Sequence, residues 1–181
     1  DRSPGPFNVL FPYRVPTNLI TYINKSSILR SHGRYSYGTR KMTDKDGNTC
    51  WCEGARSWGI GQWVEFGLDI KKPLEKIEII NGLIKNKHLY YANGRIKKIR
   101  VTINGEKKHS FIATLEDRFA GYKGCPLEGF ICKYQTIHLH RYLSNIPVPK
   151  KIKLEIVEVY PGKKYKDTCI SEVLFIYEHA H

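Results

Sequence analysis

The segment KIRVTING, Lys98–Gly105, alternates apolar and polar side chains and then ends in an Asn-Gly pair. In an extended chain, Ile99, Val101 and Ile103 fall on one face and the polar residues between them fall on the other. This alternation is typical of a half-buried β-strand. Both residues of the Asn-Gly pair tolerate positive φ, so the pair predicts a hairpin turn. The segment therefore indicates a sheet with one face in the core.

The same period of two recurs along the chain, whereas no long stretch has a convincing helical period. Residues 83–98 come nearest to a helix, but Asn93-Gly94 interrupts them. About seven or eight short strands separated by turn residues indicate a sandwich or jelly roll, so we expect an all-β fold. The further expected strands are 62–68, 74–80, 135–139, 152–159 and 170–177.

The N-terminal segment reads differently, because four prolines in residues 1–18 disfavour both a helix and a central strand. We expect an extended arm over residues 1–25, a single domain over residues 26–178 and a tail over 179–181. The expected anchors of this arm on the domain are Phe7, Leu10, Phe11 and Tyr13.

Composition narrows the class of protein. The 41% hydrophobic and 12% aromatic residues argue against disorder. The chain has no run of about eighteen apolar residues, which excludes a membrane-spanning helix. A net charge of +13 predicts attraction to polyanions such as sulfated glycans. Because neither a recognition helix nor a base-stacking motif is evident, we expect no specific nucleic-acid partner.

The five cysteines are poorly spaced for zinc and fit a secreted disulfide framework better. Cys125 and Cys132 flank a short loop that a local bridge could close. Cys169 could tie back to Cys52 or to Cys50, which leaves one cysteine as a buried thiol or an intermolecular link. This framework predicts an extracellular or bacterial cell-surface location, with the signal or lipid anchor lying outside this sequence.

Catalytic motifs are missing from the sequence. It contains no G-x-S-x-G, H-E-x-x-H, P-loop or G-x-G-x-x-G. His138 and His140 would share one strand face, but no third metal ligand lies nearby in the sequence. We therefore expect a protein that is not an enzyme, and a metal-dependent hydrolase built on a jelly roll is the least favoured alternative.

One loop concentrates hard oxygen ligands of the kind that calcium prefers. Asp, Asn and Thr gather between residues 43 and 54, and Glu172 on the last strand would add a carboxylate if the chain ends meet. The alternative is an Asp-Gly-Asn turn that caps a strand.

Aromatic and basic residues supply the candidate ligand site. Trp58 is expected to be exposed, whereas Trp51 and Trp63 are expected in the core; exposed aromatic rings stack on sugars or anchor partners. Basic residues on outward strand faces would form a cationic stripe if their strands are neighbours, or otherwise a solvated sheet face. The candidate ligand-binding residues are Arg56, Trp58, Tyr90, Tyr91, Lys97, Lys98, Arg100, Lys151 and Lys153.

Several motifs, in order over residues 26–177, resemble the discoidin-like, galactose-binding domains of the coagulation-factor C type. These are DKDGNTCW at 44–51, GQWVEF at 61–66 and CISEV at 169–173. The match is closer to a bacterial branch that is found beside secreted NAD glycohydrolases, where it serves toxin translocation, and in surface lipoproteins. The motifs shared with that branch lie at 49–54, 59–63, 79–82, 90–97 and 159–172.

The resemblance implies a β-sandwich jelly roll whose first and last strands are adjacent and whose loops at one end bind ligand. It also implies the disulfides Cys52–Cys169 and Cys125–Cys132, with Cys50 left free. The implied calcium positions are Asp44, Asp46, Thr49 and Glu172, with Lys45 where the family has glycine.

The function that follows is a non-catalytic binding module of a bacterial secreted or surface protein. Its expected partners are glycans, sulfated polysaccharides, or host matrix or complement proteins. The alternative is an accessory or translocation domain of a toxin or enzyme.

Overall fold

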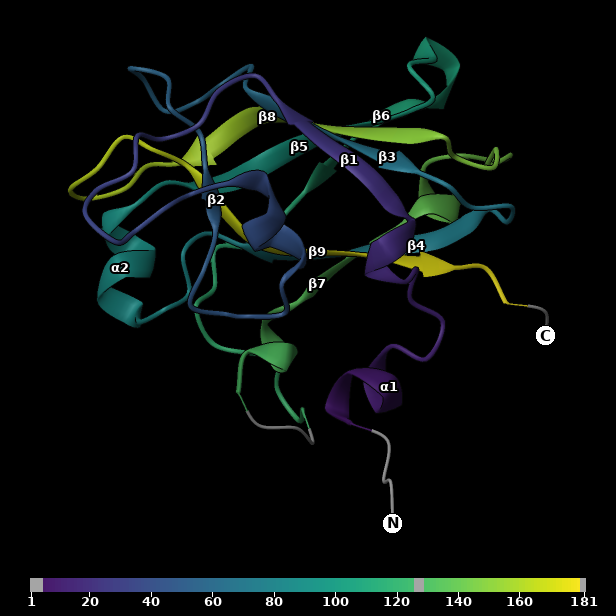
Figure 1. Ribbon diagram of the computed structural model, residues 1–181, viewed down its shortest axis with the longest axis horizontal. Helices are drawn as coiled ribbons and strands as arrows, with labels where there is room; N and C mark the ends of the chain where they lie inside the picture. The colour runs from purple at the N-terminus through teal and green to yellow at the C-terminus, as the bar shows by residue number, and fades with distance from the viewer. Residues whose placement is uncertain (1–4, 126–128, 180–181) are drawn as a thin grey trace.

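The alternating segments form two antiparallel sheets that pack face to face (Figure 1). The structure, a computed structural model, describes residues 5–125 and 129–179. The five-stranded sheet runs in the order β1 (Ile20–Lys25), β3 (Trp63–Leu68), β8 (Lys151–Tyr160), β5 (Arg95–Ile103) and β6 (Ser110–Thr114). The four-stranded sheet runs in the order β2 (Trp51–Cys52), β9 (Cys169–Tyr177), β4 (Leu74–Asn81) and β7 (Gln135–His138). The all-β sandwich expected from the sequence is therefore confirmed.

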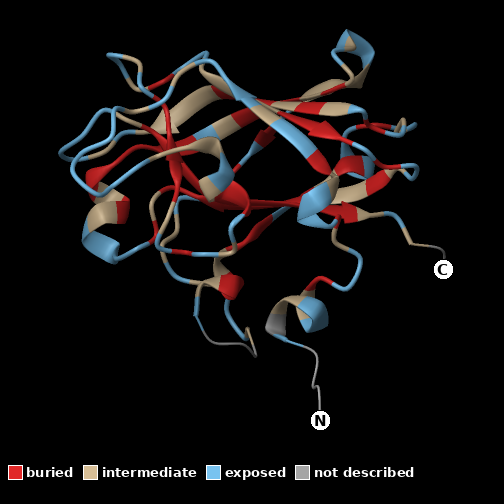
Figure 2. Ribbon diagram, in the orientation of Figure 1, coloured by how far each residue is buried: buried red, intermediate tan, exposed pale blue. Residues whose placement is uncertain are grey.

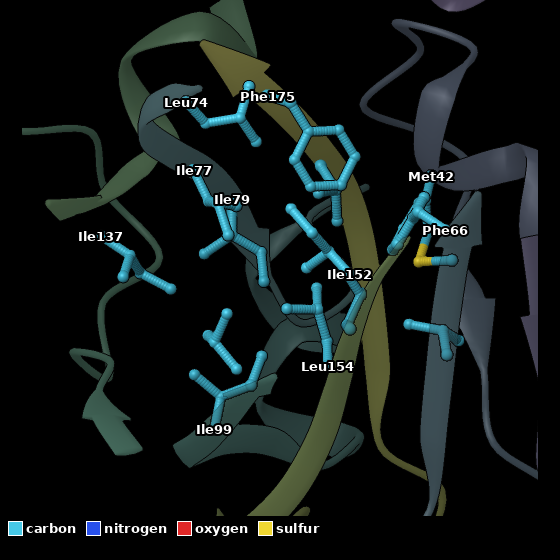
Figure 3. Packing of buried hydrophobic residues seen from close by; sticks show 14 of the residues in the cluster. Met42, Phe66, Leu74, Ile77, Ile79, Ile99, Ile137, Ile152, Leu154 and Phe175 are labelled. Carbon is cyan, nitrogen blue, oxygen red and sulfur yellow. The ribbon is translucent and has the colours of Figure 1, made fainter. Parts of the chain in front are cut away.

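The core lies between the two sheets, where their apolar faces meet (Figure 3). Phe66 of β3 and Phe175 of β9 meet edge to face with ring centroids 5.1 Å apart. In the paired strands β5 and β8, Val101 lies opposite Leu154, so their core-facing side chains are in register. Burying each side chain of this size stabilises the fold by about 1.5–3 kcal/mol.

The predicted turn after β5 is present but longer than a two-residue hairpin. Asn104 and Gly105 have φ values of 55° and 68°, as the Asn-Gly pair requires. A 3-10 turn, η3 (Lys107–His109), follows before β6 begins.

The N-terminal segment is not an extended arm, which corrects the prediction. Residues Pro6–Leu10 form the short helix α1, and η1 (Thr17–Leu19) follows. Proline does not prevent this helix, because at its start the missing N–H has no partner to lose. The arm still lies on the domain: Phe11 is buried, and Val15 donates a backbone hydrogen bond to Phe175 at 2.8 Å.

Both ends of the chain contribute to the domain. The residues of β1 pair with β3, so the sheet begins at residue 20 and not after residue 25. At the other end, the ring of His179 stacks on Tyr13 at 4.5 Å, which makes Tyr13 a half-exposed surface contact. The expected tail beyond His179 and the loop residues 126–128 lie outside the described residues.

Helix α2 (Lys87–Ala92) forms within the region that came nearest to a helical period. Asn86 caps it, since its Oδ1 accepts the N–H of Leu89 at 2.8 Å. The remaining 3-10 turns are η2 (Thr39–Thr43), η4 (Gly129–Lys133) and η5 (Leu139–Arg141). None of the helices in the described ranges is long and apolar enough to cross a bilayer.

The expected histidine pair does not form. His138 ends β7, whereas His140 lies in η5, so the two do not share a strand face. His140 instead pairs with Glu178, with 3.4 Å between Nε2 and Oε1.

A second apolar cluster covers the outer face of the four-stranded sheet. Phe11, Tyr134 and Ile176 belong to it, and α1 packs on it through Phe7 and Leu10. This cover explains why β9 is buried on both faces. By contrast, the loops beside β2 and α2 are largely exposed (Figure 2).

Candidate functional site

A disulfide fixes the end of the sandwich at which the candidate site lies. Cys52 and Cys169 face each other across the β2–β9 pair and are bonded, as the resemblance implies. Cys125 and Cys132 form the second disulfide. Cys50 is free and buried, and its Sγ lies 3.4 Å from that of Cys52. Burial raises the pKa of the Cys50 thiol to about 12, so this thiol is not a ready nucleophile.

Glu53 fastens the loop that follows β2 to the chain before β9. Its carboxylate is fully buried and accepts N–H groups from Ala55 at 2.7 Å and from Thr168 at 3.0 Å. The Thr168 hydroxyl in turn donates to the Trp58 carbonyl at 2.7 Å. The Cys-Glu-Gly part of the recognised motif is therefore structural.

Arg95 fastens α2 and the loop after β8 to β5. Its guanidinium makes a two-point contact with Asp117, at 3.1 Å from Nε and 2.8 Å from Nη2, and also donates to the carbonyls of Asn93 and Pro161. Tyr90 donates to the same Asp117 carboxylate at 2.9 Å and is fully buried. Tyr90 therefore braces the framework and cannot contact a ligand, which corrects its place among the candidates.

Asn81 links the two sheets through its side chain, since it lies in β4 and Ile96 lies in β5. Its side chain donates to the Ile96 carbonyl at 2.7 Å and accepts the Ile96 N–H at 2.8 Å. Ser171 donates to the carbonyl of the next residue, Gly82, at 2.6 Å. The Asn-Gly motif at residues 81 and 82 thus aligns β4 with β5 and β9.

These clamps leave a cavity of about 630 Å³ at this end of the sandwich. Four segments form its walls: the loop 29–37, residues 41–50, the segment from Leu83 to Asn93, and the loop before β9. Buried Cys50 lies among the lining residues. The lining side chains that carry charge or an aromatic ring are Arg30, His32, Arg34, Tyr35, Tyr37, Lys41, Lys85, Tyr165 and Asp167.

Positive charge in the cavity is held over an aromatic ring. The Arg34 guanidinium carbon and the Lys85 Nζ lie 5.5 and 5.1 Å from the ring centroid of Tyr35. A hydrogen bond from Arg34 and the two positive charges lower the pKa of Tyr35. Burial raises the pKa of Asp167, the acidic residue in this lining. The cavity therefore offers cations, which attract anionic groups, beside rings that can stack on sugars.

The predicted calcium loop brings together the side chains of Asp44, Thr49 and Glu172, but not the carboxylate of Asp46. Asp44 Oδ2 accepts the Thr49 hydroxyl at 2.5 Å, and Glu172 Oε1 accepts the Asp46 N–H at 3.2 Å. Burial and the neighbouring Asp44 carboxylate raise the pKa of Glu172 to about 10. The other oxygen of Glu172, Oε2, is buried without a hydrogen-bond partner. The carboxylate of Asp46 instead accepts the Asn48 N–H at 2.9 Å, as in the strand-capping alternative.

Lys45 keeps the turn that glycine makes in related domains. Its φ is 57°, in the left-handed region that glycine favours. The side chain places Nζ 5.7 Å from the Phe7 ring centroid in α1. The loop geometry is thus retained at the cost of some backbone strain.

The predicted cationic stripe does not form, although its strands are neighbours. In the β5–β8 pair, Lys98 Nζ lies 3.3 Å from Glu158 and Arg100 forms a salt bridge with Glu155. Lys153 lies over the Trp63 ring at 4.9 Å. The outer face of the sheet is therefore largely charge-paired, because the register sets acidic residues opposite basic ones.

The other expected residues are dispersed over the surface. Trp63 is half-buried and not in the core, because it lies on the outer face of β3 whereas the next residue, Val64, faces the core. Trp58 is half-buried and not exposed. Arg56 and Lys97 are exposed but line neither this cavity nor a smaller one, of about 350 Å³, which lies beside α2. Lys151 lies opposite Gly67 in the β8–β3 pair. Tyr91 is half-buried in α2 and lines that smaller cavity.

Sequence reasoning missed most of the cavity wall. A signal for it is the segment RSHGRYSY, residues 30–37, in which Arg30, His32 and Arg34 are followed by two tyrosines. Arg30, Arg34 and Lys85 join one site only through the fold, because Lys85 is far from the other two in the sequence.

Comparisons with solved structures agree with this architecture. CBM32-3, from a family 31 glycoside hydrolase of Clostridium perfringens, has 15% identity and a TM-score of 0.62, covering 92% of this chain and 96% of that chain. The family 32 CBM of C. perfringens NanJ, in complex with galactose, has 16% identity and a TM-score of 0.55, covering 85% and 91%. Arabinofuranosyltransferase AftD from Mycobacteria has 16% identity and a TM-score of 0.57 over 88% of this chain, which spans only 11% of AftD.

Identities this low show the fold alone, whereas the family is shown by the sequence. No curated protein sequence matches this chain. Residues 13–176 match the family described as NAD glycohydrolase translocation F5/8 type C domain. Together with the motifs that build the clamps, this match places the chain in the NAD glycohydrolase translocation F5/8 type C domain family, on a discoidin-like β-sandwich.

Proposed function

We propose that this chain is a non-catalytic, extracellular module of a bacterial secreted or surface protein, and that it binds glycans in the cavity beside β2. The observation that carries the proposal is the cavity itself: rings and cations from four segments converge on the end of the sandwich that the Cys52–Cys169 disulfide fixes. Ligand sites are typically concave, with a few placed polar groups.

The comparison with NanJ supports the sugar ligand, because that domain of the same fold was solved with galactose. The tyrosines add a physical reason. Tyr35 is 46% exposed and Tyr165 is 42% exposed, so part of each aromatic side chain is open to a sugar.

A glycan array tests the proposal, and the Tyr35→Ala variant links any binding to the cavity. We expect binding by the wild type and a loss of at least about fivefold for the variant, because a stacking ring contributes about 1 kcal/mol or more. Tyr142→Ala is the matched control, since Tyr142 is equally exposed, at 42%, and lines neither cavity. Binding that the Tyr35 variant retains in full would exclude this cavity.

The family description supports a second candidate function, an accessory role in translocation beside a catalytic domain. Deleting residues 13–176 from a protein that carries such a domain tests this role. We expect the catalytic rate to remain unchanged and delivery to a target cell to fall. Delivery that does not fall would count against the role.

A calcium ion fits part of the loop that the resemblance indicates. Asp44 and Glu172 supply two neighbouring carboxylates, Thr49 supplies a hydroxyl, and the unpartnered Glu172 Oε2 is an oxygen that a cation would satisfy. We propose that these three residues hold a structural calcium ion, which would tie the loop to β9. Isothermal titration with CaCl₂ tests this, and a Glu172→Gln variant should lose the heat of binding.

A further inference from the structure

A second, smaller basic cavity of about 350 Å³ lies beside α2. Lys87, Lys163 and Lys164 line it, together with His88 and Tyr91. The function proposed above makes no use of these residues.

The two cavities share their walls. Leu89 and Asn93 of the α2 segment line the main cavity, whereas Lys87 and Tyr91 of the same helix line the smaller one. Likewise, the loop before β9 gives Tyr165 to the main cavity and Lys164 to the smaller one. The cavities are therefore neighbours on either side of two short segments.

Basic residues outnumber acidic ones in the lining of both cavities. Within the described ranges, no salt bridge involves Arg30, Arg34, Lys41, Lys85, Lys87, Lys163 or Lys164. Rings position some of these cations without neutralising them: Lys163 Nζ lies 5.7 Å from the Tyr91 centroid, and Lys164 Nζ lies 5.2 Å from that of Tyr165. On the outer face of the five-stranded sheet, by contrast, Lys98 and Arg100 are paired with glutamates.

We propose that the two cavities form one continuous track for an acidic polysaccharide, which places a sugar in the main cavity and carries its sulfate or carboxylate groups across α2 to Lys87, Lys163 and Lys164. This inference rests on the proposed function, because the main cavity is the sugar subsite. In addition, this inference specifies that the ligand is acidic and that it is long enough to span both cavities.

A polysaccharide fits this surface better than a lipid bilayer or a nucleic acid. The cations lie in two concave cavities lined with tyrosine rings, whereas a bilayer requires a flat or protruding basic face with apolar side chains. The strand faces carry no row of exposed aromatic rings for stacking bases, and in the described ranges the longest α-helix, α2, spans only six residues.

The test uses size-defined heparin oligosaccharides as probes, measured by isothermal titration calorimetry. A heparin disaccharide is short enough for the main cavity alone, whereas a decasaccharide can span both. The test variant is Lys87→Gln/Lys163→Gln/Lys164→Gln. Its matched control, Lys72→Gln/Lys107→Gln/Lys123→Gln, removes the same charge from exposed lysines that line neither cavity.

We expect the test variant to bind the decasaccharide at least about tenfold more weakly and to bind the disaccharide as the wild type does. The slope of log affinity against log salt should also become shallower by about two, because three ionic contacts are lost. The control should change neither ligand's affinity by more than about twofold, since exposed charges away from the ligand act weakly.

Three results would overturn the track. The test variant could bind the decasaccharide as the wild type does, heparin that is both desulfated and carboxyl-reduced could bind as tightly as heparin, or anionic vesicles or single-stranded DNA could bind more tightly than the decasaccharide at equal salt. Failure of the proposed function looks different: no glycan, neutral or acidic, would then depend on Tyr35.

Discussion

The Glu172→Gln variant should change how the stability of the metal-free protein depends on pH. Burial and the neighbouring Asp44 carboxylate raise the pKa of Glu172 from 4.5 to about 10, so the folded protein keeps a proton that the unfolded chain releases. A group whose pKa is raised by folding contributes to the stability of the folded state. This contribution is fully present below the pKa of the unfolded chain and is lost as the pH rises towards the pKa of the folded protein. Glutamine does not titrate and lacks this dependence.

The size of this pH dependence follows from the one additional proton that the folded protein binds at Glu172. Between the two pKa values, the free energy of unfolding falls by about 1.4 kcal/mol per pH unit because of Glu172. From about pH 6 to about pH 8, the stability of the variant relative to the wild type should therefore rise by about 3 kcal/mol. Other buried carboxyl groups, such as Glu53 and Glu78, contribute equally to both proteins and cancel in the difference.

Urea unfolding in the presence of EDTA, followed by tryptophan fluorescence, measures this difference at each pH. Glu116→Gln is the control, because its side chain is 74% exposed on the surface and should give the same difference at both pH values. A Glu172 difference that stays constant with pH would refute the reasoning. With calcium added, the wild type should gain more stability at the higher pH, since the ion displaces the proton, whereas the variant should gain none.

Three further predictions concern residues that hold the fold together or lie buried in it. Asp117→Asn should lower the free energy of unfolding by about 3 kcal/mol in urea unfolding, because it leaves the buried Arg95 charge without its partner; a loss below about 1 kcal/mol would contradict this clamp. Lys45→Gly should raise thermal stability by about 1 kcal/mol, since glycine adopts φ 57° without strain, and a loss would show that the Lys45 contact with Phe7 matters more. Cys50 should resist iodoacetamide at neutral pH until urea unfolds the protein, and mass spectrometry that finds rapid labelling of the native state would contradict its burial and raised pKa.

The sequence predicted the strands inside the two sheets and the edge strand β7, but it missed the edge strands β1, β2 and β6. The strands β5 and β8 alternate because each lies inside a sheet and faces the core on one side. The edge strand β1 exposes four of its six side chains and fully buries only one, so it carries little alternation to detect. Strand β6, at the opposite edge, is similar, with a single fully buried residue.

The candidate site was harder to predict, because it depends on relations between strands and loops. The register that pairs Arg100 with Glu155 cancels the predicted stripe, and nothing in either strand alone reveals that pairing. Tyr90 looks like a surface ring until Asp117, from another segment, is seen to accept its hydroxyl. By contrast, the disulfide partners and the meeting of Asp44 with Glu172 followed from the resemblance, since motif order reflects strand adjacency.

The disulfide between β2 and β9 also restricts how the chain can pass through a narrow opening. It joins residues 117 positions apart, so the segment between them remains a closed ring after every strand has separated. A closed ring cannot be threaded end first as a single extended strand; two strands must enter side by side. If this domain crosses a pore in an unfolded state, the pore must admit a double strand, or a reductant must first open the ring.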